Sequence, residues 1–234
     1  MEVNGSTSTD ETNVVIPQQK RKVIVILENA SLEAAKLNPN RYDSKMQLLN
    51  CDEHQSILKR LGRDIADARP DIVHQCLLTL LDSPLNKAGH LEVYIHTAKG
   101  VVIRINPECR IPRTIKRFSG LMIQLLERGY ITSQMGQTKL LEIITPPLIQ
   151  HLPKDAIKLA LSWNAPKVRL YSYFKELNLD EKPLVIAVGA MAKGEDTFAD
   201  AYTDEKIGIS NYSLSASVAC GKVCCALEDL WNVM

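Results

Sequence analysis

Two apolar runs near opposite ends of the chain constrain its fold most. Residues 23–27 and 184–188 contain no polar side chain and are rich in valine and isoleucine. A strand with water on one face alternates apolar and polar residues, so an unbroken run predicts a strand buried on both faces, as in a parallel sheet. Helical patterns lie between the two runs. We therefore predict an α/β fold with a mostly parallel sheet flanked by helices.

The first third of the chain predicts short helices and one ambiguous segment. A short helix is expected at residues 30–36, with Asn29 or Ser31 as its cap. Helical spacing covers residues 54–61, and Gly62 ends it. Residues 71–81 fit a strand or a helix, and the apolar residues 77–81 favour a strand at the end of this segment.

The middle of the chain carries a hairpin signal. Residues 91–95 and 101–105 are apolar and flank a short polar turn that contains Gly100. We expect this hairpin to form a small insertion, at about residues 90–112, beside the main sheet. The polar residues 1–20 predict a disordered tail, so residues 21–234 are expected to form a single domain.

The remaining elements are clearer. Residues 113–128 predict a helix, with Pro112 near its first turn and Gly129 at its end. A short strand is expected at residues 207–209 and a final helix at residues 215–231.

Composition limits the function classes. Lysine and arginine number 28 against 27 acidic residues, a net charge of +1, so any affinity for nucleic acid must come from a local cluster. The six cysteines form no Cys-x-x-Cys pair, which favours free thiols in a reducing compartment and predicts no metal site. Cys220 and Cys224 are expected to be buried in the last helix. No run is long enough for a membrane span, and no secretory signal is visible.

Arginines cluster at the start of the predicted helix 113–128. Arg110, Arg113 and Arg117 step by three and four, which places them on one face if the helix begins near Pro112. A row of guanidinium forks suits phosphate oxygens, although a solvated helix face is the alternative. The opposite, buried side is expected to hold Ile115, Phe118, Leu121, Met122 and Leu125.

A second arginine group precedes residue 72. Arg63 is followed by Asp64, and Arg69 and Asp71 flank Pro70, which fixes the local backbone. A carboxylate two residues away can hold a guanidinium in one rotamer and leave its other donors for a ligand. The alternative is a structural salt bridge in a loop.

Three polar or glycine-containing loops follow predicted strands near the C-terminus. They cover residues 161–163, 188–194 and 209–215. Ligands of open α/β sheets bind where such loops converge, and Gly189 and Gly194 would let the backbone approach a flat adenine. The second loop lacks the lysine and hydroxyl of a phosphate-binding loop, which argues against ATP. The alternative is that both glycines only form turns.

These segments match one known family in order along the chain. The matching stretches are Ser31-Leu32-Glu33, Leu49-Asn50-Cys51-Asp52, Ala68-Arg69-Pro70-Asp71-Ile72, Leu81-Asp82-Ser83-Pro84-Leu85-Asn86-Lys87-Ala88-Gly89, Ile111-Pro112-Arg113-Thr114, Arg117-Phe118, Gly120-Leu121-Met122, Val188-Gly189-Ala190 and Ile209-Ser210-Asn211-Tyr212. Through them the chain resembles the eukaryotic ribosome-biogenesis methyltransferases of the SPOUT class, which act on N1 of a pseudouridine in small-subunit (18S) rRNA. The similarity runs from about residue 22 to the C-terminus.

The resemblance implies a SPOUT core with a trefoil knot, a homodimer, and S-adenosylmethionine (S-adenosyl-L-methionine) as the cofactor. It implies a nuclear, nucleolar location, with rRNA and small-subunit pre-ribosome proteins as partners. Asp71 would hold Arg69 against the target base, and Arg69, Arg110, Arg113 and Arg117 would bind RNA. The residues implied to hold the cofactor are Leu161, Gly189, Gly194, Ile209, Ser210, Asn211, Tyr212, Ser213 and Leu214.

One position departs from the family pattern, and the chemistry leaves one step open. Ser213 stands where the family has proline after Asn-Tyr, and we expect cofactor binding to survive this change. Methyl transfer requires loss of the N1 proton, and Arg69 could stabilise the resulting charge. Asp71 and Asp82 are candidate bases, but a carboxylate paired with arginine is a poor base at neutral pH.

Two other functions fit parts of the sequence. A non-catalytic RNA-binding assembly factor for the small ribosomal subunit would depend on the arginines and have no cofactor affinity. A cofactor-dependent enzyme acting on small molecules would make the arginine cluster incidental, and its binding would lack the salt dependence of phosphate contacts.

Overall fold

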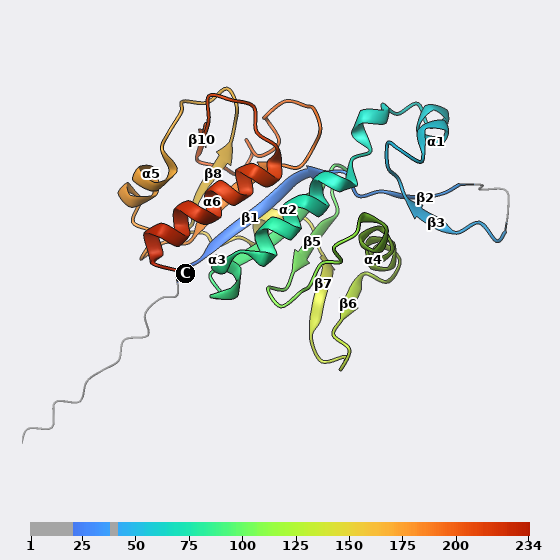
Figure 1. The fold of residues 1–234 in the computed structure, drawn as a ribbon, viewed down its shortest axis with the longest axis horizontal. Helices are drawn as coiled ribbons and strands as arrows, with labels where there is room; N and C mark the ends of the chain where they lie inside the picture. The colour runs from blue at the N-terminus through green and yellow to red at the C-terminus, as the bar shows by residue number, and fades with distance from the viewer. Residues whose placement is uncertain (1–20, 38–41) are drawn as a thin grey trace, which may run out of the picture.

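The computed structural model describes residues 21–37 and 42–234, and its centre is an eight-stranded sheet (Figure 1). The predicted tail at residues 1–20 lies outside the described residues. The strands are β1 (Val23–Ala30), β4 (Leu91–Thr97), β5 (Val102–Ile105), β6 (Tyr130–Thr132), β7 (Lys139–Ile144), β8 (Ile157–Leu161), β9 (Leu184–Gly189) and β10 (Glu205–Ile207). They lie in the order β10-β8-β9-β1-β4-β5-β7-β6.

The two apolar runs form the centre of this sheet. β1 pairs in parallel with β9 on one side and with β4 on the other. β8 and β10 extend the parallel part, whereas β5, β6 and β7 are antiparallel. Val23 and Leu27 are fully buried, as expected for a strand with protein on both faces. The predicted α/β class with a mostly parallel sheet is therefore confirmed.

The hairpin prediction was right about the turn and wrong about its place. β4 and β5 pair antiparallel around Gly100, whose φ of +77° suits the turn. β4 also pairs with β1, so the hairpin belongs to the main sheet instead of lying beside it as an insertion. A local hairpin signal contains no information on which other strand its edge will meet.

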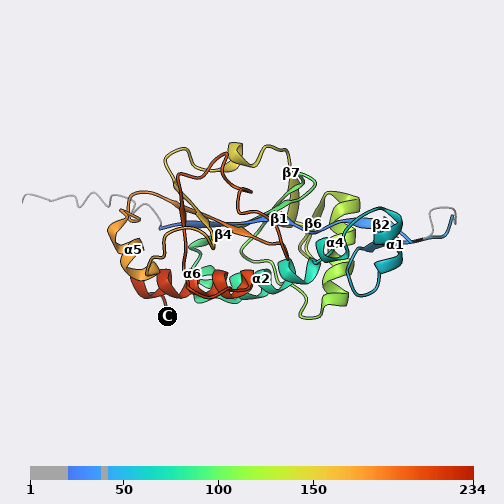
Figure 2. The same ribbon diagram turned by 90° about the horizontal axis from the view of Figure 1, so that it is seen from above.

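The helices pack mainly on one face of the sheet (Figure 2). α2 and α6 lie side by side on this face, and α6 also contacts α5. The opposite face carries η2 and long connections, with a second apolar cluster that includes Ile24, Ile26 and Leu148. The helices are α1 (Gln55–Arg60), η1 (Ile65–Asp67), α2 (Pro70–Asp82), α3 (Pro84–Lys87), α4 (Ile115–Arg128), η2 (Leu148–His151), α5 (Leu170–Glu176) and α6 (Ala216–Trp231).

Two predictions of local structure were wrong. The expected helix at residues 30–36 is replaced by β2 (Ala34–Lys36), which pairs with β3 (Met46–Leu48). The segment expected to end as a strand is the helix α2, with Pro70 in its first turn. Its buried residues Val73, Leu77 and Leu80 recur at helical spacing, and this long-range burial outweighs the local strand preference.

The other three predicted helices, at residues 54–61, 113–128 and 215–231, are confirmed with shifted ends. α1 and α6 match their expected positions, and Gly129 ends α4 with φ +81°. The short strand predicted at 207–209 lies slightly earlier, as β10. Cys220 and Cys224 are buried free thiols in α6, as expected. Within the described residues, no helix has the length and apolarity to span a bilayer.

Candidate functional site

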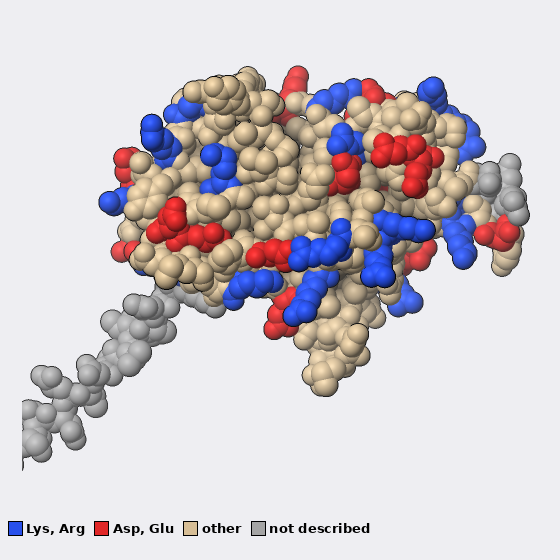
Figure 3. All heavy atoms as spheres, viewed as in Figure 1, with Lys and Arg blue, Asp and Glu red and all other residues tan. Residues whose placement is uncertain are grey.

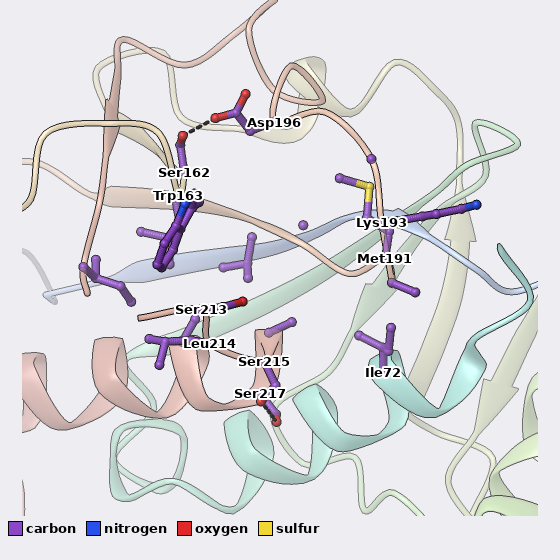
Figure 4. A pocket seen from close by; sticks show the side chains of 18 of the residues that line it. Ile72, Ser162, Trp163, Met191, Lys193, Asp196, Ser213, Leu214, Ser215 and Ser217 are labelled. Atoms are coloured by element: carbon purple, nitrogen blue, oxygen red, sulfur yellow. Dashed lines mark hydrogen bonds between the residues drawn. The ribbon is translucent and has the colours of Figure 1, made fainter. Parts of the chain in front are cut away.

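The loops that follow β8, β9 and β10 converge on one cavity of about 480 Å³, as predicted (Figure 4). The carboxyl ends of parallel strands meet at one edge of a sheet, which explains why loops distant in sequence share this wall. The first turns of α2 and α6 complete the cavity, through Ile72 and Ala216. Its volume falls within the range of small-molecule sites, roughly 300–1,000 Å³.

All but one of the predicted cofactor residues line this cavity. The lining includes Leu161, Gly189, Gly194, Ile209, Ser210, Tyr212, Ser213 and Leu214. Asn211, between Ser210 and Tyr212, lies outside it. The Ser210 hydroxyl accepts a hydrogen bond from the Tyr212 backbone N–H at 2.9 Å, which shapes the turn at this position.

Glycine is suited to the two predicted positions, 189 and 194, for different structural reasons. A Cβ added at Gly189 would lie 3.0 Å from the Phe198 ring, so the close packing of β9 against the following loop favours a residue without a side chain. Gly194 has φ +144°, and a Cβ there would lie 2.9 Å from the Met191 sulfur. Gly194 therefore serves backbone conformation, and Gly189 serves close approach.

One polar contact in the cavity was not predicted. The buried Ser162 hydroxyl donates a hydrogen bond to Asp196, which joins the loop after β8 to the loop after β9 (Figure 4). This bond lowers the pKa of Asp196 below its ordinary value, so the carboxylate is ionised at neutral pH. No motif in the sequence links positions 162 and 196, and only the fold brings them together.

Arg69 and Asp71 form the predicted pair at the cavity wall. Arg69 Nε and Nη2 donate to the two Asp71 oxygens at 2.8 and 2.6 Å, a bidentate arrangement. The bond from Arg69 lowers the pKa of Asp71, and the same pair raises the pKa of Arg69. Arg69 lines the cavity, and within the described part of the chain its Nη1 has no hydrogen-bond partner. That nitrogen is available to a ligand.

The second candidate base is far from this pair. Asp82 ends α2, whereas Arg69 caps its beginning, a separation of about 20 Å at 1.5 Å per residue. Asp82 instead pairs with Arg113 at 2.5 Å. Within one chain, Asp82 is therefore too far from Arg69 to act as a base in the same cavity.

The three predicted RNA-binding arginines do not share one helix face. α4 begins at Ile115, so Arg110 and Arg113 precede the helix and only Arg117 lies within it. All three are exposed. Ile115, expected on the buried side, is 42% exposed because it occupies the first turn, beyond the packed part of α4.

The segment before α4 is nevertheless held in place. His74 of α2 makes a 2.7 Å hydrogen bond to the Pro112 carbonyl through Nε2. The same ring stacks on Phe118 with centroids 4.6 Å apart. The arginines before α4 are therefore presented on an anchored segment beside α2.

One of two ion pairs in the segment at residues 63–64 reaches the cavity. Arg63 pairs with Glu33, and Asp64 pairs with Lys193 of the loop after β9. Lys193 lines the cavity, so Asp64 supports its rim without lining it, whereas Arg63 and its partner Glu33 lie outside the cavity lining.

The cavity fits S-adenosylmethionine by the chemistry of its walls. Leu161, Ile209 and Leu214 offer apolar surface to an adenine ring, and the glycine loop offers backbone groups. Asp196 supplies a negative charge suited to an ammonium group.

Comparisons with known proteins agree with this chemistry. The family described as EMG1/NEP1 methyltransferase matches residues 25–228. The chain is 51% identical to a Candida albicans protein named ribosomal RNA small subunit methyltransferase NEP1, over 97% of this chain and 82% of that protein. It is 47% identical to the Homo sapiens protein of the same name, over 92% of this chain and 84% of the other.

A solved structure gives the same result. The crystal structure of Archaeoglobus fulgidus Nep1 bound to S-adenosylhomocysteine superposes with a TM-score of 0.74 at 28% identity. The match covers 90% of this chain and 99% of that one. S-adenosylhomocysteine is the product that remains when S-adenosylmethionine gives up its methyl group. From its sequence, its fold and the loops around this cavity, the chain belongs to the EMG1/NEP1 methyltransferase family.

Proposed function

We propose that the chain transfers the methyl group of S-adenosylmethionine to N1 of a pseudouridine in small-subunit (18S) rRNA. The observation that carries the proposal is the bidentate Arg69–Asp71 pair at the wall of the cofactor cavity. It places a fixed cation beside the space where an acceptor base would meet the cofactor. The relatives named as ribosomal RNA small subunit methyltransferases support RNA as the substrate class.

The reaction needs little covalent chemistry from the protein. S-adenosylmethionine, when bound, supplies an electrophilic methyl group on a sulfonium. The acceptor N1 carries a proton, and its loss puts negative charge on the ring carbonyls of the base. Arg69 Nη1 is the donor that can stabilise this charge, because Asp71 holds the other two guanidinium nitrogens. The rigid walls of the cavity align the two reactants, which lowers the entropy cost of transfer.

Asp71 acts as a positioning residue and not as the base. Its pKa is lowered by the hydrogen bond from Arg69, so it holds a proton poorly at neutral pH. Both its oxygens are also occupied by Arg69. We therefore assign charge stabilisation to the Arg69–Asp71 pair and no role in proton removal.

The direct test is methyl transfer in vitro. Purified protein, S-adenosylmethionine and a short RNA hairpin with pseudouridine in its loop are expected to give RNA heavier by one methyl group. The same hairpin with uridine has no N–H at the equivalent ring position and should stay unmodified. Methylation of both RNAs, or of neither, contradicts the proposal.

An RNA-binding assembly factor without catalysis is the second candidate. The exposed Arg110, Arg113 and Arg117 favour it as well, since they need no cofactor. It predicts arginine-dependent RNA binding with no calorimetric signal for S-adenosylmethionine. Saturable cofactor binding by the wild type, lost in Gly189→Trp, excludes it.

The proposal extends to assembly and location. We propose a homodimer that works in the nucleolus with pre-ribosomal proteins of the small subunit. Val218 of α6 is 50% exposed, and such an apolar side chain on a packed helix suits a subunit contact. Light scattering during gel filtration is expected to give twice the chain mass, and a tagged protein should co-localise with a nucleolar marker.

A further inference from the structure

A second cavity lies at the other end of α2, outside the cofactor site. Its volume is about 340 Å³. Leu77, Leu78 and Leu81 of α2 form one wall, and Cys109 and Ile111 of the segment before α4 contribute to another. The charged residues around it are Asp82, Lys87, Arg110 and Arg113. We name this cavity the α2 groove.

The α2 groove combines an apolar floor with a cationic rim. Leu77, Leu81, Cys109 and Ile111 are buried, whereas Lys87 and Arg110 are exposed. Burial raises the pKa of the Cys109 thiol to about 11, so this floor stays uncharged. Asp82 is the single acid of the rim, and it is paired with Arg113. The net charge around the groove is therefore positive.

The surrounding surface continues the same charge. Figure 3 shows lysine and arginine side chains gathered on the face over α2, α3 and α4, with fewer acidic groups among them. A polyanion that crosses this face would meet cations at the rim and apolar surface in the groove. A nucleotide has this pairing, since its phosphate is charged and its base is flat and largely apolar on its faces.

The distance to the cofactor cavity fits one continuous RNA. Arg69 precedes the first residue of α2, and Leu78 lies nine positions further along this helix. At 1.5 Å per residue, the two are about 14 Å apart along the helix axis. A strand advances roughly 3.4 Å per nucleotide along a duplex axis and further when its bases are unstacked, so that gap corresponds to about four nucleotides or fewer. A base in the α2 groove and a target base at Arg69 can therefore belong to the same loop.

We propose that the α2 groove binds one unstacked nucleobase of the substrate RNA, a few nucleotides from the target, with Lys87 and Arg110 on the adjoining phosphates. This inference rests on the proposed function, because it takes the target base to lie at Arg69. The groove reads an unpaired neighbour of the target and thereby favours RNA loops over duplexes. Leu78 supplies accessible apolar contact, since it is only half-buried.

The test is a set of double-mutant cycles between protein and RNA, measured as dissociation constants by fluorescence anisotropy with the full chain. Each RNA is the pseudouridine hairpin with one loop nucleotide replaced by an abasic site. The groove variant is Leu78→Ala. Its matched control is Leu126→Ala, which removes the same atoms from a half-buried leucine of α4 outside the groove.

One abasic position is expected to weaken binding to the wild type about fivefold or more, as loss of a base contact does. For Leu78→Ala, the same abasic site should weaken RNA binding less than about twofold, because the base contact is already lost. For Leu126→Ala, it should weaken RNA binding as much as it does for the wild type. Lys87→Gln should lower the salt slope of RNA binding by about one. Thermal melting of each variant verifies folding.

Two results overturn the groove. In the first, every abasic site weakens RNA binding by Leu78→Ala as much as it weakens binding by the wild type. In the second, Leu126→Ala removes the affinity loss at an abasic site as fully as Leu78→Ala does. Methyl transfer to the unaltered hairpin is measured in parallel. If the hairpin is methylated but no abasic penalty depends on Leu78, the groove proposal alone is refuted. If an abasic penalty depends on Leu78 but the hairpin is not methylated, the groove is supported and the proposed reaction is refuted.

Discussion

At Arg69, two hydrogen bonds decide how a mobile side chain becomes a fixed charge. An arginine normally explores several rotamers, and the Asp71 carboxylate holds this one through Nε and Nη2. Pro70 between them sets the backbone and begins α2. Two residues close in sequence thus build one side of the site, which is why this pair could be predicted from the sequence.

Replacing Arg69 with lysine tests that geometry. An ammonium keeps the charge but cannot make the bidentate fork, so we expect kcat for RNA methylation to fall about 100-fold. The comparison is Arg104→Lys. Arg104 is exposed and pairs with Glu142 of β7, outside the cavity, so this variant should keep kcat within about twofold. An Arg69→Lys enzyme that works at the wild-type rate would show that the fork is unnecessary.

Gly194 and Gly100 form a second matched pair. Both have positive φ, +144° and +77°, so an alanine at either position costs roughly 1–3 kcal/mol of folding free energy through backbone strain. Only Gly194 lines the cofactor cavity. Gly194→Ala is therefore expected to weaken S-adenosylmethionine binding about tenfold or more in calorimetry, equivalent to about 1.4 kcal/mol. Equal affinities for the two variants would mean that the Gly194 conformation does not shape the site.

At the scale of elements, α2 connects the two cavities. Its first turn carries Ile72 at the cofactor cavity, and its second half carries Leu78 at the α2 groove. Its buried side packs against β1, and His74 fixes the segment before α4. A single rigid helix can therefore hold a target base and its neighbour at a constant separation.

The contact between β1 and β4 includes a titratable histidine, His96. His96 of β4 makes a 2.8 Å hydrogen bond through Nδ1 to the carboxylate of Glu28 on β1, which is 2% exposed. Tyr202 donates to the other oxygen at 2.5 Å. The bond to Glu28 raises the pKa of His96 above its ordinary value of 6.5. Protonated His96 therefore stabilises the fold through this hydrogen bond.

The sign of this effect sets the pH profile. With a raised folded-state pKa, the stabilisation is full below about pH 6.5, the unfolded value, and is lost as pH rises through the folded-state pKa. Urea unfolding at several pH values should show wild-type stability falling across this range. His96→Gln should remove this component, whereas His151→Gln, whose ring bonds only to the Thr145 carbonyl among the described residues, should retain it. An unchanged profile in His96→Gln would refute the assignment.

At the scale of the whole molecule, charge is balanced overall and separated locally. The net charge of +1 gives no general attraction to RNA. Cations nevertheless gather over α2, α3 and α4 (Figure 3). Affinity for RNA is thus expected to depend on where a lysine or arginine lies and not on how many the chain contains.

Salt titration of RNA binding distinguishes a cation within this cluster from a cation elsewhere on the chain. Arg113→Gln should weaken RNA binding at every salt concentration and lower the slope of log affinity against log salt by about one, the loss of one phosphate contact. Arg21→Gln removes the same charge at the start of β1, where Arg21 pairs with Asp180, and should leave the slope unchanged. Equal slopes for the two variants would mean that the cluster does not contact phosphates.

The sequence by itself determined the elements whose pattern is local. The runs at 23–27 and 184–188 gave buried parallel strands, Gly100 and Gly129 gave a turn and a helix end, and the Arg69–Asp71 pair needs only two neighbouring residues. The predicted cofactor residues came from the family resemblance, and the convergence of their loops follows from parallel strands ending at one edge. The trefoil knot was implied only by the family resemblance, because the threading of a chain leaves no periodic signal in its sequence. It stays a prediction.

Only the tertiary structure decided what depends on long-range burial. Residues 77–81 favour a strand locally, but packing of α2 against α6 and β1 makes them helical. The Ser162–Asp196 bond and the α2 groove join residues far apart in the chain, and no spacing rule connects such positions. Folding free energy is gained by burying surface between elements, so the partners of a residue are fixed only when those elements meet.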